Sequence, residues 1–286
     1  MIEIILNFLI RNNLQSLNKF FFKIYKFFLK KRIVLNFSKY KFYAYPQKKE
    51  LSRCMIKNLK IWDKGYIEII LNQIKNDNTI FLDIGSNYGA YSIPVAKLNN
   101  KINVYCFDPS EKALNQLKDN IQLNDIKNIK YFKIGVGEKK KIVYFDDEIK
   151  NYNNSGSYQI NNNNLGWKIL VNSIDNLIMN GEIIPKKNFI IKIDIEGYEF
   201  LALKGLIQTI KNFDVFILFE FSNKTILNHD NFSILFKKFL TQNNLRVFNS
   251  EFDEIEIEEM FEQINFFSKD NELAIDYIIS KNINLK

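Results

Sequence analysis

The chain has 286 residues, of which 47% are apolar and 25% are charged, with two cysteines and a net charge of +8. This length suits one full-sized domain with an accessory segment, and the apolar share excludes an intrinsically disordered chain. Cys54 and Cys106 lack metal-ligand spacing, which disfavours a zinc-binding or disulfide-stapled protein and is typical of a reducing compartment.

The charge is unevenly distributed along the chain. Residues 1–60 contain 14 Lys and Arg against 2 Asp and Glu, whereas the remaining residues contain 26 against 30. This contrast predicts a basic, aromatic-rich helical extension over 1–60 and a mildly acidic domain over 61–286. The N-terminal apolar run is about ten residues, too short to span a bilayer, and no signal-peptide cleavage pattern is present. We therefore expect a cytoplasmic protein.

Within the extension, the stretch Lys19–Arg32 has the pattern of an amphipathic helix. Apolar and aromatic residues fill most of its circumference, and its lysines recur at helical spacing, at Lys19, Lys23, Lys26 and Lys30. Two interpretations of residues 1–35 stay open. The segment contacts the anionic inner face of a membrane, or it docks on the domain with its lysines in water.

The rest of the chain alternates between strand and helix patterns. Apolar runs predict strands at 79–84, 102–107, 129–136, 188–193, 214–221, 245–249 and 275–280. Helices are predicted at 90–98, 111–123, 198–210 and 232–240, and short added strands at 141–145 and 168–172. This order predicts an α/β fold with a doubly wound, mostly parallel seven-stranded sheet, and the Asn-rich segment 150–164 is expected to form a loop beside its site.

The first candidate site is the turn Asp83-Ile84-Gly85-Ser86-Asn87-Tyr88-Gly89, where strand 79–84 leads into a helix. Its glycines allow positive φ and close approach of a ligand, and the helix N-terminus attracts an anion. However, the order D-x-G-x-x-x-G differs from the G-x-G-x-x-G of dinucleotide sites. Asp83 would repel a pyrophosphate but attract the ammonium and sulfonium charges of S-adenosylmethionine.

Asp108 lies 23 residues beyond Gly85, at the end of the second strand. A carboxylate at this place accepts hydrogen bonds from ribose hydroxyls, although the sequence Asp108-Pro109-Ser110 would also organise a turn and a helix start. Because both features occur in consecutive strand–helix units, we interpret them as one S-adenosylmethionine site. Its predicted cofactor-binding residues are Asp83, Gly85, Ser86, Asn87, Gly89, Asp108 and Asp194.

The second candidate site is the block Lys192-Ile193-Asp194-Ile195-Glu196-Gly197-Tyr198-Glu199, where strand 188–193 meets its helix. Ligands of such folds bind at the carboxyl ends of strands. Asp194 and Glu196 are therefore candidates to orient a substrate hydroxyl, to act as general base or to hold a divalent cation. The structural alternative has Glu196 capping the helix and Glu199 in solvent. His229, the only histidine, is a weaker candidate base.

Several blocks together resemble the FkbM-type family of S-adenosylmethionine-dependent methyltransferases. The resemblance covers residues 79–222 and is carried by Asp83–Gly89, Phe107-Asp108-Pro109, Leu117 with Asn120, Ser173-Ile174-Asp175, Lys192–Glu199 and Phe219-Glu220. The family usually has Glu in place of Asp108, which preserves the carboxylate. The resemblance implies O-methylation of a hydroxyl on a sugar, glycan or related small molecule, often in surface-polysaccharide biosynthesis, and no nucleic-acid partner.

Three rival functions are disfavoured by particular residues. Nucleobase amino-methyltransferases resemble one another in an Asn/Asp-Pro-Pro-aromatic block after the fourth core strand. This chain has Asp194-Ile195-Glu196-Gly197 at that place. A nicotinamide-dependent oxidoreductase is disfavoured by the glycine spacing. A catalytically silent membrane-associated binding protein that retained the fold is disfavoured by the intact acids at all three sites.

Overall fold

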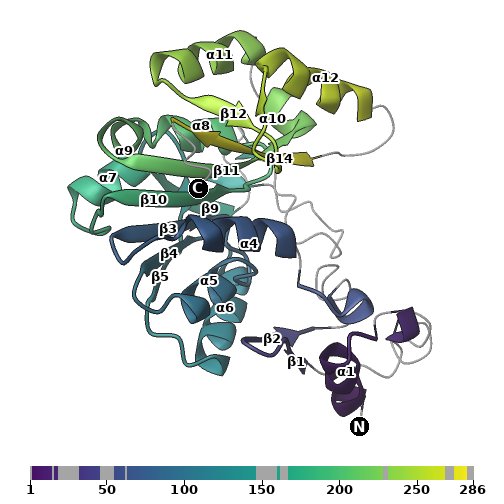
Figure 1. Cartoon of the computed structure of the whole chain (residues 1–286). Coiled ribbons are helices and arrows are strands. Elements are labelled where there is room, and N and C mark those ends of the chain that lie inside the picture. Colours follow the sequence, from purple (N-terminus) through teal and green to yellow (C-terminus); the bar gives the residue numbers. More distant parts are fainter. Residues whose placement is uncertain are drawn as a thin grey trace.

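The computed structural model describes residues 2–14, 16–18, 32–45, 55–61, 63–145, 160–161, 167–227, 231–267 and 274–281. An eight-stranded sheet forms the centre of this part, with helices on both faces (Figure 1). Its strands, in spatial order, are β13 (Glu254–Ile255), β12 (Arg246–Phe248), β14 (Ala274–Ser280), β11 (Asp214–Ser222), β10 (Asn188–Ile193), β3 (Thr79–Ile84), β4 (Asn103–Phe107) and β5 (Ile129–Phe132).

The sheet has the predicted doubly wound topology. Strands β3, β4, β5, β10 and β11 are parallel, whereas β14 runs antiparallel to β11 and β12. From β3 the chain proceeds outward through β4 to β5 and then returns to β10 on the other side of β3. The carboxyl ends of β3 and β10 therefore flank a topological switch point, where ligands of such folds bind. All seven predicted strands are present, and the two-residue β13 adds the eighth.

A second sheet accounts for the end of the predicted strand 129–136. β5 ends at Phe132, and β6 (Gly135–Val136) joins a four-stranded sheet with β9 (Trp167–Asn172), β7 (Lys141–Phe145) and β8 (Ile160–Asn161). One predicted strand is therefore two. The added strands predicted at 141–145 and 168–172 are confirmed and run antiparallel to each other. Apart from β8, the predicted loop 150–164 lies outside the described residues.

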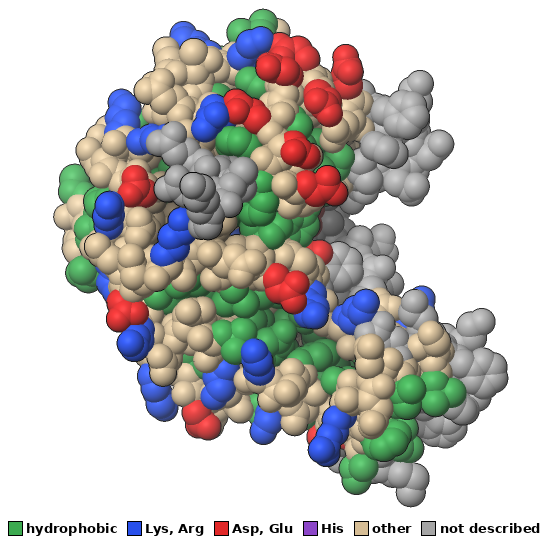
Figure 2. All heavy atoms as spheres, viewed as in Figure 1, with side chains coloured by type: hydrophobic (Ala, Val, Ile, Leu, Met, Phe, Trp, Pro, Cys, Tyr) green, Lys and Arg blue, Asp and Glu red, His purple; other side chains and the backbone are tan. Residues whose placement is uncertain are grey.

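The helices divide between the two faces of the main sheet. One face is covered by α7 (Ile174–Met179), α8 (Glu199–Lys204), α9 (Ile207–Asn212), α11 (Phe232–Gln242) and α12 (Ile257–Phe267), with α10 (Asn223–Leu227) after β11. The other is covered by α4 (Lys64–Gln73), α5 (Ser92–Leu98) and α6 (Glu111–Leu123). Acidic side chains gather over α12 in Figure 2, in keeping with the mildly acidic domain.

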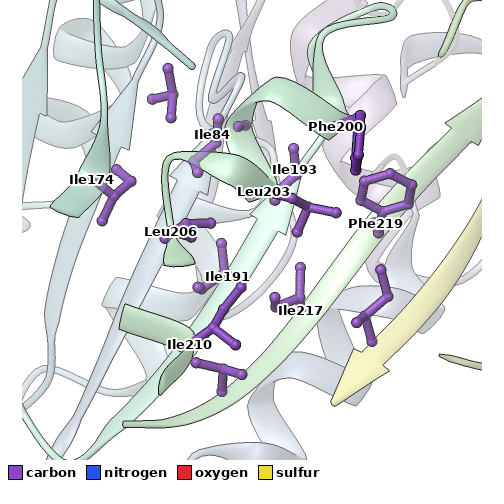
Figure 3. Packing of buried hydrophobic residues seen from close by; sticks show 14 of the residues in the cluster. Ile84, Ile174, Ile191, Ile193, Phe200, Leu203, Leu206, Ile210, Ile217 and Phe219 are labelled. Atoms are coloured by element: carbon purple, nitrogen blue, oxygen red, sulfur yellow. The ribbon is translucent and has the colours of Figure 1, made fainter. Parts of the chain in front are cut away.

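The predicted helix 198–210 is interrupted between α8 and α9. A Cβ on Gly205 would lie 2.1 Å from the carbonyl oxygen of Gly137, so the chain passes this point only with glycine. Figure 3 shows Leu203, Leu206 and Ile210 on either side of this break, facing isoleucines of β10 and β11. Both short helices thus bury one apolar face against the same part of the sheet.

Alternation along each strand decides which side chains reach the site. Odd and even positions of a strand face opposite sides of a sheet. In β3, Leu82 and Ile84 join the core beneath α8, whereas Asp83 faces α4 and α5. By the same alternation, Lys192 of β10 and Glu220 of β11 share the face of Asp83. The sheet therefore gathers its polar residues on the α4 face.

The N-terminal part packs on the same face through a structure that was only partly predicted. Helix α1 (Ile2–Arg11) buries Leu6 and Leu9 beside a hairpin of β1 (Ile33–Asn36) and β2 (Lys41–Ala44). Asn120 of α6 accepts a hydrogen bond from the backbone N–H of Tyr43 at 2.9 Å. The hairpin was not predicted. The predicted helix Lys19–Arg32 lies outside the described residues, apart from Arg32.

Within the described ranges, no helix is both long and apolar enough to span a bilayer. Residues on both sides of position 60 contribute to one buried cluster. The domain boundary at residue 60 remains a prediction.

Candidate active site

The turn after β3 is held in a shape that requires its glycines. Gly85 and Gly89 have φ of +83° and +90°, and Asn87 between them has φ of +48°. A Cβ on Gly85 would lie 1.8 Å from the carbonyl oxygen of Asp194. The backbone N–H groups of Gly85 and Ser86 donate to Phe107 O at 2.9 and 3.0 Å. Gly85 thus brings the ends of β3, β4 and β10 into contact.

Asp83 is fully buried directly beneath this turn. Its Oδ2 accepts a hydrogen bond from Ser92 Oγ, whereas Oδ1 has no hydrogen-bond partner among the described residues. The nearest cation is Lys192 Nζ, 4.0 Å from Oδ1. Burial raises the pKa of Asp83, an effect that Lys192 partly offsets. An unsatisfied buried carboxylate oxygen is costly, so this atom marks a place where a cationic group would be stabilised.

Asp108 connects the two strand–helix turns. Its Oδ2 accepts from the N–H of Asn87 at 2.9 Å, and its Oδ1 accepts from the N–H of Ser110 at 2.8 Å. Ser110 in turn caps α6 by accepting from Ala113 N. Asp108 therefore has the turn-organising role that we considered as an alternative. Each carboxylate oxygen has a second lone pair, so this role is compatible with binding ribose hydroxyls.

Lys192 links the turn to the second candidate site. Its Nζ donates to Asp194 Oδ2 at 2.7 Å and to the carbonyl oxygen of Gly85 at 3.3 Å, and it lies 5.1 Å from the centre of the Tyr91 ring. Burial alone would lower the pKa of Lys192, but the carboxylates of Asp194 and Asp83 raise it above its ordinary value. Asp194 is thereby fixed beside the turn that contains Gly85.

Glu199 determines the conformation of the turn that follows Asp194. This side chain is fully buried, and its Oε1 accepts from the N–H groups of Ile195 and Gly197 at 3.0 and 2.9 Å. Its Oε2 accepts from Thr225 Oγ1 at 2.7 Å. The alternative that placed Glu199 in solvent is therefore wrong. Glu196 adopts φ of +57°, an uncommon conformation for a residue other than glycine, and stays half-buried at the tip of the turn.

Three carboxylates occupy neighbouring strands at the carboxyl edge of the sheet. Glu220 of β11 lies directly opposite Asp276 of β14 in the antiparallel register, and Asp194 follows the β10 residue that is opposite Phe219. We call Asp194, Glu220 and Asp276 the acidic row. Asp63, immediately before α4, approaches it and accepts a hydrogen bond from Tyr91 Oη at 3.1 Å. The sequence placed Glu220 near a strand end, but it gave no signal for Asp63 or Asp276.

The acidic row has unusual electrostatics. Burial, followed by repulsion from Asp194, Glu199 and Asp276, raises the pKa of Glu220 well above its ordinary value. Burial and the carboxylates of Asp194 and Asp63 raise the pKa of Asp276 to about 7. Burial also raises the pKa of Asp63. Carboxyl groups perturbed in this way concentrate at functional sites.

The structure brings most of the predicted site residues to one edge. Asp83, Gly85, Ser86, Asn87, Gly89, Asp108 and Asp194 surround the ends of β3, β4 and β10. Ser86 Oγ is buried and has no partner among the residues described. His229 lies outside them. Across the described ranges, no cluster of three or more Asp, Glu, His or Cys has an arrangement that would hold a metal ion.

Comparison with known proteins identifies the family. The family model for the methyltransferase FkbM domain matches residues 83–266, well over half of the chain. The chain belongs to the family of FkbM-domain methyltransferases. The match begins at the Asp83 turn and includes the Lys192–Glu199 block, so the resemblance stated from the sequence is confirmed. The predicted cofactor, S-adenosylmethionine, agrees with this membership, whereas a nicotinamide-dependent oxidoreductase does not.

Individual relatives are distant. The hexuronic acid methyltransferase AglP of Haloferax volcanii is 24% identical over 158 residues, which are 54% of this chain and 61% of AglP. The chain thus spans less than two thirds of that relative. Among solved structures, M. jannaschii TYW2 in complex with AdoMet has a TM-score of 0.38 at 15% identity, covering 88% of this chain and 87% of TYW2. An rRNA methylase from Streptococcus thermophilus has a TM-score of 0.39 at 11% identity, covering 75% and 93%.

Proposed function

We propose that this FkbM-domain protein transfers a methyl group from S-adenosylmethionine to a hydroxyl of a sugar or glycan-related acceptor. The observation that carries the proposal is the contact between the two predicted sites: Lys192 donates both to Gly85 in the glycine turn and to Asp194. This contact brings a carboxylate suited to a hydroxyl acceptor beside the turn suited to the cofactor. The relative AglP, named as a hexuronic acid methyltransferase, supports an acceptor of the glycan class.

The residues around β3 and β4 fit S-adenosylmethionine. The cofactor carries a sulfonium and an ammonium group, and the unsatisfied Oδ1 of Asp83 is a buried partner for positive charge. Asp108 would accept the ribose hydroxyls, while the glycine turn, with Ser86 and Asn87, would line the cofactor. When bound, the cofactor supplies a methyl group on a positively charged sulfur, which leaves with the electron pair of the broken C–S bond.

The protein contributes mainly orientation and proton transfer. Holding the acceptor oxygen in line with the methyl carbon is worth up to ~7–11 kcal/mol of the barrier. Removal of the hydroxyl proton by a carboxylate adds about 10²–10⁴-fold. Asp194, fixed by Lys192, would orient the acceptor hydroxyl, and Glu196 at the neighbouring turn is the second candidate from the same block.

The test is transfer of isotopically labelled methyl from S-adenosylmethionine to a panel of glycosides, analysed by mass spectrometry. We expect labelled methyl ethers on sugar hydroxyls, with formation of S-adenosylhomocysteine. Labelling confined to nucleobases, or to amines, would contradict the proposed acceptor class. Tight binding of NAD with none of S-adenosylmethionine would contradict the cofactor.

We also propose that residues 1–35 attach the enzyme to anionic membranes, where a lipid-linked acceptor would be available. Helix α1 supports this proposal because it has two apolar faces. Leu6 and Leu9 are buried against the hairpin, whereas Ile4 and Phe8 are 74% and 57% exposed. Figure 2 shows apolar side chains on the surface beside α1. With the excess of Lys and Arg in residues 1–60, the exposed face would bind reversibly to anionic lipid.

Substitution of the exposed face tests membrane attachment without disturbing the core. Ile4→Ser combined with Phe8→Ser should abolish flotation with liposomes that contain anionic lipid, while the melting temperature stays unchanged. The matched control is Leu6→Ser on the buried face, which should lower the melting temperature. Retained flotation of the double variant, or wild-type binding that ignores both lipid charge and salt, would contradict the proposal.

A further inference from the structure

We propose that Glu220 and Asp276 form the acceptor subsite, and that this subsite takes an uncharged, hydroxyl-bearing sugar in preference to a uronic acid. The inference rests on the proposed function, which it makes more specific. It concerns two residues that the Asp83 turn and the Lys192–Glu199 block do not include. It also separates this chain from its relative AglP, whose name specifies a hexuronic acid.

The subsite follows from strand register. Leu218 is opposite Lys192 on one side and Ile278 on the other. Two residues further out, Glu220 is opposite Asp276, and Asp194 follows the last paired residue of β10, Ile193. Side chains directly opposite in an antiparallel sheet have Cβ atoms about 4.5–5.5 Å apart. Glu220 and Asp276 therefore face each other on the side of the sheet that carries Asp83 and α4. An acceptor beside them would lie next to the cofactor turn.

No ion pair or hydrogen bond joins the side chain of Glu220 or Asp276 to any of the residues described. The charge of Lys192 acts on Asp276, but Lys192 forms its short ion pair with Asp194, at 2.7 Å. Two carboxyl groups that have no donor among the described residues, at the edge of the sheet where ligands of such folds bind, are placed to contact an acceptor.

A carboxyl pair of this kind matches a hydroxyl group. Burial and repulsion by neighbouring carboxylates raise the pKa of Glu220 well above its ordinary value and the pKa of Asp276 to about 7, so both groups hold a proton more readily than ordinary carboxyl groups do. A carboxyl group donates when it is protonated and accepts when it is ionised, and these two capacities complement the oxygen and the hydrogen of an alcohol. In the transfer step, the acceptor oxygen forms its bond to the methyl carbon as the C–S bond breaks, and the hydroxyl proton passes to the ionised carboxylate.

The same crowding disfavours an anionic acceptor. Asp194 and Asp63 already raise the pKa of Asp276, and Asp194 raises that of Glu220. A sugar carboxylate placed among these groups would need a cation to neutralise it. The cation at this place is Lys192, which already donates to Asp194 and Gly85. Like charges in a partly desolvated site repel strongly. An uncharged sugar avoids this repulsion and uses its hydroxyls.

Matched acceptors test the subsite. The initial rate of S-adenosylhomocysteine formation is compared for methyl hexopyranosides and the corresponding methyl hexuronides, which differ only in the C6 carboxylate. We expect wild type to methylate the neutral sugars at least ~10-fold faster, since repulsion of ~1.4 kcal/mol suffices for that ratio. The combined variant Glu220→Gln, Asp276→Asn should lose most of its turnover and show a ratio near one, with S-adenosylmethionine affinity within a few-fold of wild type. Glu256→Gln, which removes an exposed charge beside α12, is the control and should leave the ratio unchanged.

The outcomes separate this inference from the function on which it rests. Equal or faster methylation of the hexuronides, or unchanged turnover in the double variant, overturns the subsite while leaving the glycan methyltransferase intact. Cofactor binding without transfer to any neutral or acidic glycoside overturns the proposed function itself. A double variant that fails to bind the cofactor assigns the two residues to the cofactor side and also overturns the subsite.

Discussion

The two sides of the site differ in how the protein satisfies their carboxylates. On the cofactor side, Ser92 donates to Oδ2 of Asp83, which leaves only Oδ1 without a partner among the described residues, and two backbone N–H groups donate to Asp108. On the acceptor side, Glu220 and Asp276 face each other with no hydrogen-bond donor from the described chain. Hydrogen bonds fix the positions of carboxylates. Burial and mutual repulsion instead raise the pKa of carboxyl groups, so that these groups can exchange a proton with a substrate near neutral pH. The difference agrees with the proposed division between cofactor binding and methyl transfer.

The largest effect is expected when a methyl group is added at Gly85, where the cofactor side approaches Asp194. In Gly85→Ala, the new Cβ would meet Asp194 O at 1.8 Å, and φ of +83° would be strained. Positive φ costs of order 1–3 kcal/mol, and the clash adds to it, so we expect lost cofactor binding and a strongly lowered melting temperature. Gly181→Ala is the matched control, since Gly181 has φ of +72° but open space around it. Similar small losses in both variants would show that the close approach is unimportant.

A second large effect is expected at the residue between the two sides. Asp194→Asn keeps an oxygen for Lys192 but removes the charge that would orient the acceptor hydroxyl, so turnover should fall by about 10²-fold while cofactor affinity changes only a few-fold. Steady-state kinetics and calorimetry measure the two quantities. Asp214→Asn, at the opposite end of β11 and exposed, should behave as wild type. Restoration of activity by Mg²⁺ after chelation would assign Asp194 and Glu196 to a metal instead.

A smaller effect on stability tests the crowding of the acceptor side. The pKa of Asp276 is about 7 in the folded protein and 3.8 ordinarily, so the folded state favours the protonated form. Its contribution to stability is present below about pH 4 and is lost as the pH rises through 7. Asp276→Asn should therefore raise the melting temperature at pH 8 by about 2–6 °C, equivalent to ~1–2 kcal/mol, and by less at pH 5. The control Asp214→Asn should change little at either pH, and a destabilised Asp276→Asn at pH 8 would contradict the crowding.

Sequence patterns predicted the features that depend on local order. The strand runs, the bounds of α6 at Glu111–Leu123 and the glycine turn each follow from residues close together in the chain. Asp108 and Asp194 could be placed because the carboxyl ends of parallel strands meet at one edge. These predictions needed only periodicity and topology.

Features that depend on long-range contact were missed. Asp276 lies opposite Glu220 only because β14 enters the sheet antiparallel, with a register that no local pattern specifies. The break at Gly205 depends on the approach of Gly137, and the burial of Glu199 depends on Thr225. The predicted helical extension over 1–60 is wrong for the β1–β2 hairpin, because the pairing of these two strands is a contact that their composition does not specify.

Calorimetric titration of S-adenosylmethionine into wild type, Asp108→Ala and Asp276→Asn tests the division between the two sides most directly. Asp108→Ala should weaken binding by roughly 10–100-fold, as expected for charge-assisted hydrogen bonds worth ~1.5–3 kcal/mol. Asp276→Asn should bind the cofactor within a few-fold of wild type while losing methyl transfer. Unchanged affinity in a folded Asp108→Ala, or an equal loss of affinity in both variants, would contradict the account.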